Sequence, residues 1–183
     1  MTNSKRIPLH NRNIFLRGFI NENNLFEIEA ELVDTKHYDV PNKDRGNILR
    51  GEPIHHMKIK CIIDKDKTIV FASALTLKGP FKVCKYANKN FSKLAGIKIR
   101  PGWKKEALKI IGGLKGCTHI SELLSPIATT AFQTIEGYKS QKNRKIKNIN
   151  DRNDKKPALI GTCHAFNPKG DVVKRIWPKW HEN

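Results

Sequence analysis

The sequence predicts an α+β fold: an antiparallel sheet of two hairpins, plus a C-terminal hairpin, packed by two or three helices. Alternating apolar and polar residues dominate the first half of the chain, which is the pattern of half-buried strands. Apolar residues spaced by three and four follow, and this order of strands before helices favours α+β over a doubly wound fold. The 183 residues, 38% of them hydrophobic, suit one core, so we expect a single domain over residues 1–183.

Four strands are expected before residue 79. Residues 14–20 and 25–36 flank a turn of Asn-Glu-Asn-Asn, and apolar side chains alternate with glutamates in the second of them. Residues 55–64 and 68–78 flank the turn Asp-Lys-Asp-Lys and are rich in β-branched residues. These four segments make the two hairpins.

Helices are expected in the middle of the chain. Residues 81–94 and 103–111 have apolar side chains at helical spacing, and Cys84 falls on the apolar stripe of the first. The longest apolar face runs from residue 120 to 138. Pro126 lies inside this last pattern, so it should kink the helix or move its start later.

The last third of the chain combines a basic run with a predicted hairpin. Residues 139–156 contain eight basic and two acidic side chains, which indicates a solvated basic linker or a frayed helix end or, alternatively, a patch that binds anions. Residues 158–166 and 171–177 flank Asn-Pro-Lys-Gly, which is a turn signal and predicts the closing hairpin.

The net charge and the hydrophobic pattern limit which partners and which cellular compartment can be expected. Thirty-five Lys and Arg against 17 Asp and Glu leave a net charge of +18, which suits phosphates, so a basic nucleic-acid-binding module is one alternative function. No aromatic residue interrupts residues 139–156, which weakens a sequence-reading role. No apolar run reaches the roughly 18 residues of a membrane span, so we expect a cytoplasmic protein without membrane contact. The oligomeric state stays open.

The segment Gly-Cys-Thr-His before the long helix is the main candidate for chemistry. The four cysteines form no CxxC pair, so reduced thiols are expected. Thr118 is a plausible N-cap, which places Cys117 near the positive end of the helix dipole, where a thiolate is favoured. His119 can point the same way, and Glu122 follows it by three residues, close enough to orient an imidazole. The alternative is that Cys117 packs in the core while the other two face solvent.

Two further clusters contain histidine. Residues 52–57 read Glu-Pro-Ile-His-His-Met at a strand start, and because neighbouring strand residues face opposite sides, only one of His55 and His56 can join a given pocket. Cys163 and His164 follow the same rule in the predicted closing hairpin. These pairs lack zinc-finger spacing and could form a metal site only through tertiary folding.

The loop after the second strand is dense in ionisable groups. Asp34 and Lys36 end that strand and Arg45 follows a few residues later, so these three are candidates for binding the polar groups of a substrate. Equally, Asp39 and Asp44 could form turns while Arg45 makes a surface ion pair.

Four sequence blocks carry a resemblance to a known family. LVDTKHYD, DRGNILRGEPIHHM, GCTHISELLSPIATTAFQTI and CHAF with VVKRIWP resemble the bacterial family catalogued as domain of unknown function 2889. The resemblance runs from about residue 12 to 178 and implies no established activity. Its pattern falls on Asp34, Lys36, Arg45, Gly46, Gly51, Glu52, Pro53, His55, Met57, Cys84, Gly116, Cys117, Thr118, His119, Glu122, Leu123, Thr129, Thr130, Cys163, His164, Trp177 and Pro178. His56 replaces an acidic residue of the pattern, so only His55 is carried over.

A looser resemblance concerns the iron-sulfur scaffold proteins. The order of a Gly-x-Pro segment, two strands, Gly79, a helix, and a long helix after Cys and His is similar to theirs. That family holds a nascent cluster or zinc with three cysteines at loop ends. Here Pro80 stands at one such position, Cys84 lies a turn later and His55 replaces another. The resemblance implies a metal or iron-sulfur carrier as an alternative function.

The leading functional hypothesis is an enzyme acting on a small anionic molecule. A divalent metal such as Zn would be held by His55, Cys117 and His119, leaving a position open for water or substrate. Glu122 or Glu52 would serve as general acid or base. A metal-free variant of the hypothesis uses the Cys117 thiolate as catalytic nucleophile and His119 as its base.

Overall fold

The computed structural model describes residues 5–145 and 156–183. The chain divides into two compact units, Met1–Lys142 and Asn143–Asn183. The basic run that we predict as a linker falls partly in the last turns of a helix and partly on residues 146–155, which lie outside the described residues. The single-domain and linker interpretations therefore stay predictions.

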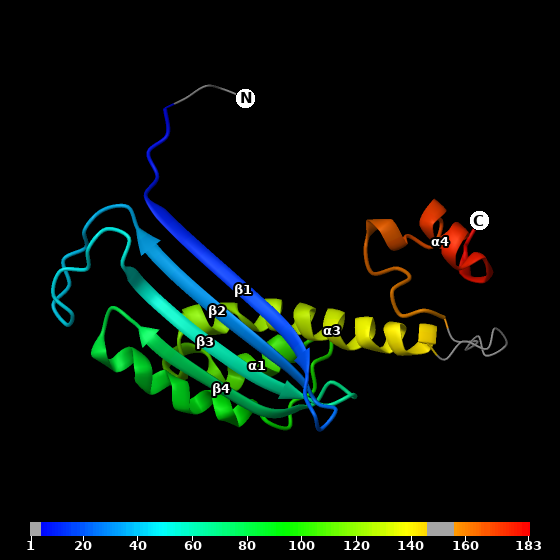
Figure 1. Cartoon of the computed structure of the whole chain (residues 1–183), viewed down its shortest axis with the longest axis horizontal. Helices are drawn as coiled ribbons and strands as arrows, with labels where there is room; N and C mark the ends of the chain where they lie inside the picture. Colours follow the sequence, from blue (N-terminus) through cyan, green and yellow to red (C-terminus); the bar gives the residue numbers. More distant parts are fainter. Residues whose placement is uncertain (1–4, 146–155) are drawn as a thin grey trace. The chain divides into compact units, whose positions relative to one another are not determined.

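The first unit is built on a four-stranded antiparallel meander in the order β1-β2-β3-β4 (Figure 1). Its strands are β1 (His10–Ile20), β2 (Phe26–Lys36), β3 (Pro53–Ile63) and β4 (Ile69–Lys78), which confirms both predicted hairpins. The first hairpin turn fits its residues, because Asn24 adopts a positive φ angle of 58°, which asparagine tolerates; in the second turn Lys67 adopts a positive φ angle of 69°, which is uncommon for lysine. The side chain of Asn21 also accepts a hydrogen bond from the backbone of Leu25, which closes the first turn.

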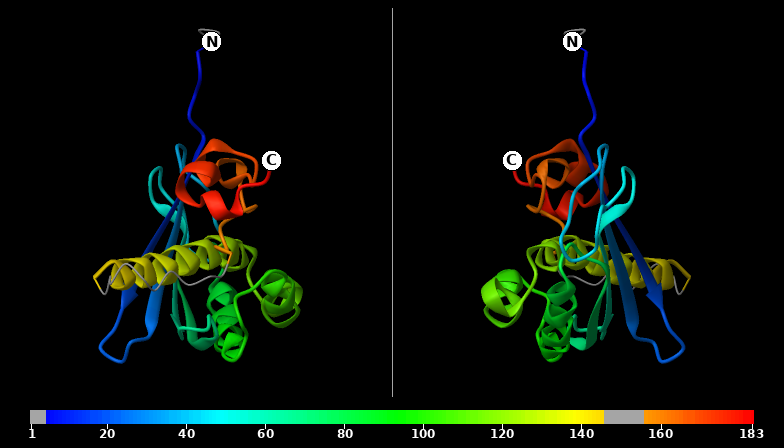
Figure 2. Two further views of the ribbon diagram at one scale, coloured as in Figure 1. Left: turned by 90° about the vertical axis from the view of Figure 1, so that its right-hand side faces the viewer. Right: turned by 90° about the vertical axis from the view of Figure 1, so that its left-hand side faces the viewer.

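One face of the sheet is covered by helices and the other is open (Figure 1, Figure 2). Along β2, alternate residues from Phe26 to Asp34 are buried, while Glu27, Glu29 and Glu31 point to the open face. The alternation that predicts the strand thus also decides which side chains can join a buried site. The core comprises Phe26, Ile28, Ala30, Leu32, Met57, Ile59, Cys61, Ile63, Ile69, Ala72, Phe91, Leu94, Ile99, Trp103, Ala107, Ile111, Ile120, Leu123, Leu124, Ile127, Ala131 and Ile135.

The covering layer consists of four main helical segments. They are the 3-10 helix η1 (Lys82–Leu94) and the α-helices α1 (Trp103–Ile111), α2 (Thr118–Glu122) and α3 (Leu124–Lys145), with a short 3-10 turn η2 (Gly113–Lys115) before α2. The predicted long helix is therefore two helices that meet at Leu123. Pro126 explains the division, because it has no N–H to donate to the carbonyl of Glu122. The long helix therefore begins later than its apolar pattern, as the position of Pro126 predicts.

Gly18 lies where β1 passes closest to α3. A Cβ at Gly18 would lie 1.9 Å from Oγ1 of Thr134, so Gly18→Ala should force the strand and helix apart. We expect it to lower the free energy of unfolding by about 1–3 kcal/mol in urea denaturation. The control is Gly137→Ala on the exposed side of α3, where a Cβ meets nothing within 4 Å. That change should raise stability by about 0.5–1 kcal/mol, and similar losses in both variants would contradict the close approach.

The second unit contains η3 (His164–Phe166), α4 (Asp171–Ile176) and η4 (Pro178–Trp180), with no strand among the described residues from 156 onward. The predicted C-terminal hairpin is therefore wrong. The turn signal is real, because Asn167 accepts a backbone hydrogen bond from Lys169, but the chain then enters a helix. The charges of this helix complement its dipole, with Asp171 in the first turn and Lys174 and Arg175 in the last. The prediction of a hairpin does not take these charges into account.

A helix that crosses a bilayer must be both long and apolar. Within residues 5–145 and 156–183, no helix combines the length and the apolar character that crossing a membrane requires.

Candidate metal centre

Asp34 is the centre of the candidate site. It lies near the end of β2 on the face that the helices cover, and its side chain is 1% exposed. Within the described part of the chain it is the one buried residue with a charged side chain. A buried carboxylate is costly unless it is paired, so the neighbours of Asp34 must compensate its charge.

Arg12 holds both oxygens of the Asp34 carboxylate. The two residues are directly paired across β1 and β2, and Nε and Nη2 of Arg12 donate to Oδ1 and Oδ2 at 2.7 and 2.8 Å. This bidentate pair fixes the plane of the carboxylate. His10, two residues earlier on the same strand face, places Nε2 3.5 Å from Oδ1.

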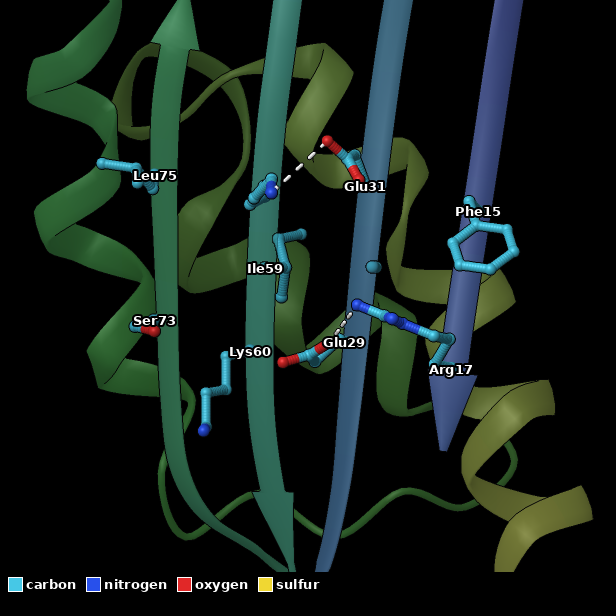
Figure 3. A pocket seen from close by; sticks show the side chains of 10 residues that line it. Phe15, Arg17, Glu29, Glu31, Ile59, Lys60, Ser73 and Leu75 are labelled. Atoms are coloured by element: carbon cyan, nitrogen blue, oxygen red, sulfur yellow. Dashed lines mark hydrogen bonds and ion pairs between the residues drawn. The ribbon is translucent and has the colours of Figure 1, made fainter. Parts of the chain in front are cut away.

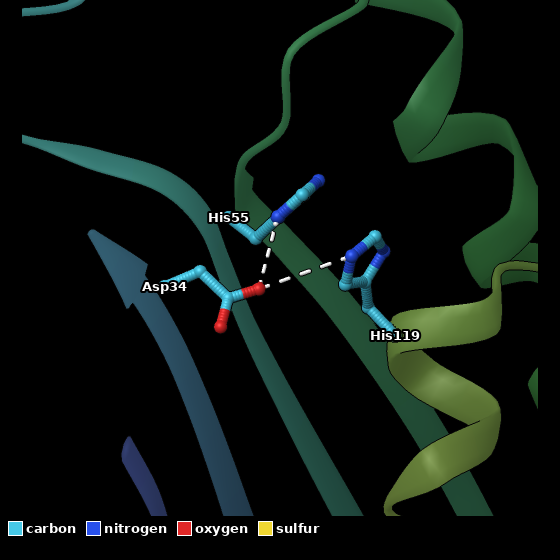
Figure 4. Close-up of side chains that lie close together, drawn as sticks. All are labelled: Asp34, His55 and His119. Atoms are coloured by element: carbon cyan, nitrogen blue, oxygen red, sulfur yellow. Dashed lines mark hydrogen bonds and ion pairs between the residues drawn. The ribbon is translucent and has the colours of Figure 1, made fainter. Parts of the chain in front are cut away.

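Two histidines approach the same carboxylate from other elements (Figure 4). Nδ1 of His55, which is paired with Asp34 across β2 and β3, lies 3.0 Å from Oδ2. Nε2 of His119, on α2, lies 3.8 Å from the same oxygen. The two imidazole rings stack with centroids 3.6 Å apart and planes at 29°. One ligand atom from each of the three residues lies within 4.8 Å of the other two, so the group could hold a metal ion.

The connection from α1 to α2 delivers His119 to the sheet. Gly113 has a φ angle of 56°, and Gly116 passes so close to the end of α1 that a Cβ there would lie 1.6 Å from the carbonyl oxygen of Ile111. Cys117 then has extended backbone angles and directly precedes α2, as the sequence predicts, but Cys117 itself is the N-cap and Thr118 is the first helical residue, so the prediction of Thr118 as N-cap is wrong. Glycines thus allow the tight return that sets His119 against β3.

The electrostatics of the group favour an ionised carboxylate beside neutral imidazoles. Burial would raise the pKa of Asp34, but the hydrogen bonds and positive charge of Arg12, helped by His55, lower it overall. Burial lowers the pKa of His55, with a further decrease from the charge of His119. Burial also lowers the pKa of His119, although Asp34 opposes the change. Neutral imidazole is the form that binds metal ions.

Glu122 lies beside the cluster, yet its partner is not the imidazole that we expect. Its carboxylate forms an ion pair with Nη1 of Arg12, and its side chain is 53% exposed. Arg12 therefore bridges a buried and an exposed carboxylate. Glu122 is thus held on the solvent side of Arg12, beside the cluster.

Cys117 is close to the cluster but outside the three-ligand group. Its Sγ lies 3.7 Å from Nδ1 of His119, whereas the opposite ring nitrogen, Nε2, faces Asp34. The metal set of His55, Cys117 and His119 that the sequence suggests is thus replaced, in this geometry, by one in which Asp34 takes the place of the cysteine. The thiol instead neighbours the second nitrogen of His119.

The other predicted site residues make local contacts. Arg45 donates to the backbone carbonyls of Pro53 and Gly79, at 3.1 and 3.4 Å. The carboxylate of Glu52 accepts from the backbone N–H of Leu49, and the ammonium of Lys36 lies 5.8 Å from the centre of the Tyr38 ring. These contacts order the loop after β2, and the assignment of Lys36, Arg45 and Glu52 to substrate or catalysis stays a prediction.

The other histidines and cysteines singled out in the sequence lie outside the Asp34 cluster. Nε2 of His56 lies 2.5 Å from Oε1 of Glu31 on the open face, so only His55 joins the buried group, as strand geometry predicts. Cys163 and His164 are exposed within the second unit. Cys61 is part of the core, where burial raises the pKa of its thiol to about 12.

Arg12 and His10 are the site residues that sequence reasoning missed. The predicted first strand begins at residue 14, whereas β1 begins at His10. Continuing its alternation backward places Arg12 on the same face as Ile14, and pairing with β2 then sets it opposite Asp34. A charged residue in the inward register of a strand was the available signal.

A hollow of about 280 Å³ lies elsewhere, on the open face of the sheet (Figure 3). Its charges are already matched across strands: Arg17 pairs with Glu29 at 2.8 Å, and Lys58 lies 3.5 Å from Glu31. Such exposed pairs add little stability, and they leave no unpaired carboxylate or imidazole to bind a ligand. The Asp34 cluster is therefore the stronger candidate.

Comparison with known proteins identifies a family and nothing closer. The family described as "Protein of unknown function (DUF2889)" matches residues 10–133, a segment that contains all four strands and every residue of the cluster. No curated protein and no solved structure is similar enough to this chain to be matched.

Proposed function

The chain belongs to the DUF2889 family, and from its site we propose that Asp34, His55 and His119 bind a divalent metal at the centre of an enzyme acting on a small anionic molecule. The observation that carries the proposal is the convergence of three ligand atoms within 4.8 Å of one another, from β2, β3 and α2. Residues this far apart in the sequence meet here only because of the fold.

The ligand set is suited to catalysis. Two imidazoles and one carboxylate bind zinc and other first-row divalent metals, and three protein ligands leave at least one coordination position for water or substrate. A metal bound there would lower the pKa of that water and polarise a substrate oxygen.

The neighbouring charged groups have complementary roles in the proposal. Arg12 positions the Asp34 carboxylate, as outer partners of metal ligands commonly do. Its Nη1 faces outward to Glu122, so an anionic substrate group could take the place of that carboxylate on the guanidinium. Glu122, exposed beside this guanidinium, would accept or supply the proton.

Metal titration of the purified, untagged protein tests the proposal. We expect Zn²⁺ or Co²⁺ to bind at about one equivalent by calorimetry, and His55→Ala and His119→Ala each to weaken binding at least about a hundredfold, because each removes a direct ligand. His56→Ala is the matched control, since His56 is the adjacent histidine on the opposite face. It should leave the affinity unchanged.

Four outcomes would contradict or redirect the proposal. Absence of binding to the unmodified chain would remove it, and equal losses for His55→Ala and His56→Ala would show that the metal is not in this cluster. Loss of binding in Cys117→Ser would make the thiol a ligand. A metal that chelators remove within seconds, without any catalysis, would favour a carrier over an enzyme.

A second candidate function uses the same side chains without metal. Sγ of Cys117, the two nitrogens of His119 and Oδ2 of Asp34 follow one another with separations of 3.7 and 3.8 Å, which is the order of nucleophile, base and orienting carboxylate. In this candidate, metal-free protein should label quickly at Cys117 with iodoacetamide near neutral pH, and His119→Ala should slow the labelling. A slow thiol in both proteins would remove it.

A further inference from the structure

The helical segments after the sheet carry more of the net positive charge of this protein than the basic run near the C-terminus does. Residues 78–115 contain eleven Lys and Arg and one acidic residue, Glu106, which gives a net +10 of the +18 of the whole chain. These residues span η1 and α1, which pack against each other. We name as the lysine face the exposed lysines of these two helices: Lys82, Lys85, Lys89, Lys93, Lys104, Lys105 and Lys109.

The lysine face is not neutralised by the protein itself. Within the described part of the chain, none of its ammonium groups lies within 4 Å of a carboxylate, and the one ion pair in this segment joins Arg100 to Glu106 at 3.0 Å. On the open face of the sheet, by contrast, Lys58 and Lys60 both lie beside glutamates. Unpaired like charges in a row repel one another, so an anionic partner would relieve a cost that folding leaves in place.

The spacing of the lysines gives this charge a direction. Lys82, Lys85, Lys89 and Lys93 are all exposed and follow one another along η1, so they form a row in the direction of the helix axis, in which Lys82 and Lys85 share one side and Lys89 and Lys93 lie successively further round the helix. At about 2 Å of rise per residue in a 3-10 helix, the row extends roughly 22 Å. That length suits several consecutive phosphates of one strand.

Aromatic side chains line a pocket at the beginning of this row. The pocket has a volume of about 310 Å³, and its walls include Phe81, Lys82, Lys85 and Tyr86. The two rings are 56% and 62% exposed, and the ammonium of Lys85 lies 5.8 Å from the centre of the Tyr86 ring. Exposed rings beside ammonium groups can stack unpaired bases while the lysines contact the backbone.

We propose that the lysine face and the pocket at Phe81 and Tyr86 bind single-stranded nucleic acid. A duplex would satisfy the lysines but keeps its bases stacked inside, so it could not use the pocket. An anionic membrane would also attract lysines, but a hollow with rings on its walls fits an inserted base better than a flat bilayer surface. This activity is independent of the Asp34 cluster.

The test measures binding of a fluorescein-labelled 12-nucleotide oligo-dT by fluorescence polarisation. With about four phosphates neutralised, affinity should fall roughly 50-fold between 50 and 200 mM salt. The triple variant Lys85→Glu, Lys89→Glu and Lys93→Glu should lose at least about a hundredfold in affinity. The matched control replaces three exposed lysines outside the face, Lys43, Lys65 and Lys174, by glutamate and thus changes the net charge equally. It should bind within about threefold of the unmodified chain.

Further variants separate stacking from charge and from the candidate metal centre. Phe81→Ala with Tyr86→Ala should weaken oligo-dT about tenfold or more and leave a 12-base-pair duplex unaffected. His119→Ala should bind oligo-dT normally. Far-UV circular dichroism confirms that each variant is folded, and Lys89→Gln with Lys93→Gln, a milder change, replaces the triple variant if that protein is unfolded.

Several outcomes would overturn this inference. They are the absence of oligo-dT binding, equal losses in the two charge-reversed triple variants, and tighter binding to the duplex than to the single strand. Binding through the same lysines to phosphatidylserine vesicles, without binding to oligo-dT, would assign the face to a membrane surface instead.

Discussion

Asp34→Ala is expected to lower the free energy of unfolding by about 3 kcal/mol. The change removes the carboxylate that Arg12 grips with two hydrogen bonds and that His55 approaches at 3.0 Å, and it leaves a guanidinium partly buried without its main partner. Urea denaturation followed by circular dichroism measures the loss. Because the anion itself is removed, the loss should be largest near neutral pH.

The control for this prediction is Glu122→Ala. Glu122 is the second carboxylate on the same guanidinium, but it is 53% exposed, so its removal should cost less than about 1 kcal/mol. A second comparison places Asp34→Ala in an Arg12→Met background, where the cost should shrink because no charge is left unpaired. Equal losses for Asp34→Ala and Glu122→Ala would show that burial does not strengthen the pair.

The metal-free protein is expected to lose stability as the pH falls below about 6.5, the ordinary pKa of histidine. The pKa values of His55 and His119 are lowered in the folded state, so the unfolded chain takes up these two protons first. Stability that is fully present above pH 6.5 is then lost as the pH falls toward the folded-state values, by up to about 1.4 kcal/mol per pH unit for each histidine. Asp34 adds a further loss below its ordinary pKa of 3.8.

Urea denaturation at a series of pH values between 7.5 and 3 measures this dependence. The double variant His55→Gln and His119→Gln should be flatter between about pH 6.5 and 5, because the groups that the unfolded chain protonates first are gone. Its lower limb, which depends on Asp34, should remain. An unmodified chain whose stability is constant from pH 7 to 5 would contradict the lowered pKa values.

The sheet could be predicted because its pattern is local. Alternation in β2 and the β-branched residues of β3 identify the strands, and short polar turns pair them. The prediction of a C-terminal hairpin is wrong because a local pattern does not show whether a strand has a partner. The described residues after 157 form short helices and no strand, and the charges of residues 171–175 stabilise α4.

The site could be predicted in part, for a reason that lies in strand geometry. The sequence predicts His55 and His119 as ligands because they lie at a strand start and a helix start, and the structure brings them into contact. The sequence predicts that Asp34 binds substrate because it ends a strand before a polar loop, and only the register between β2 and β3 shows that it faces His55. The position of Cys117 depends on which nitrogen of His119 faces it, and no sequence pattern contains that information.

Gly116 passes close beside the carbonyl of Ile111, and this tight connection constrains the number of residues between α1 and α2. One inserted or deleted residue within α2 ahead of His119 would swing its ring by about 100° around the helix axis, away from the carboxylate. Homologous chains with this arrangement should therefore differ in length elsewhere, for example in the loop between β2 and β3, and keep the segment from residue 112 to 119 at constant length.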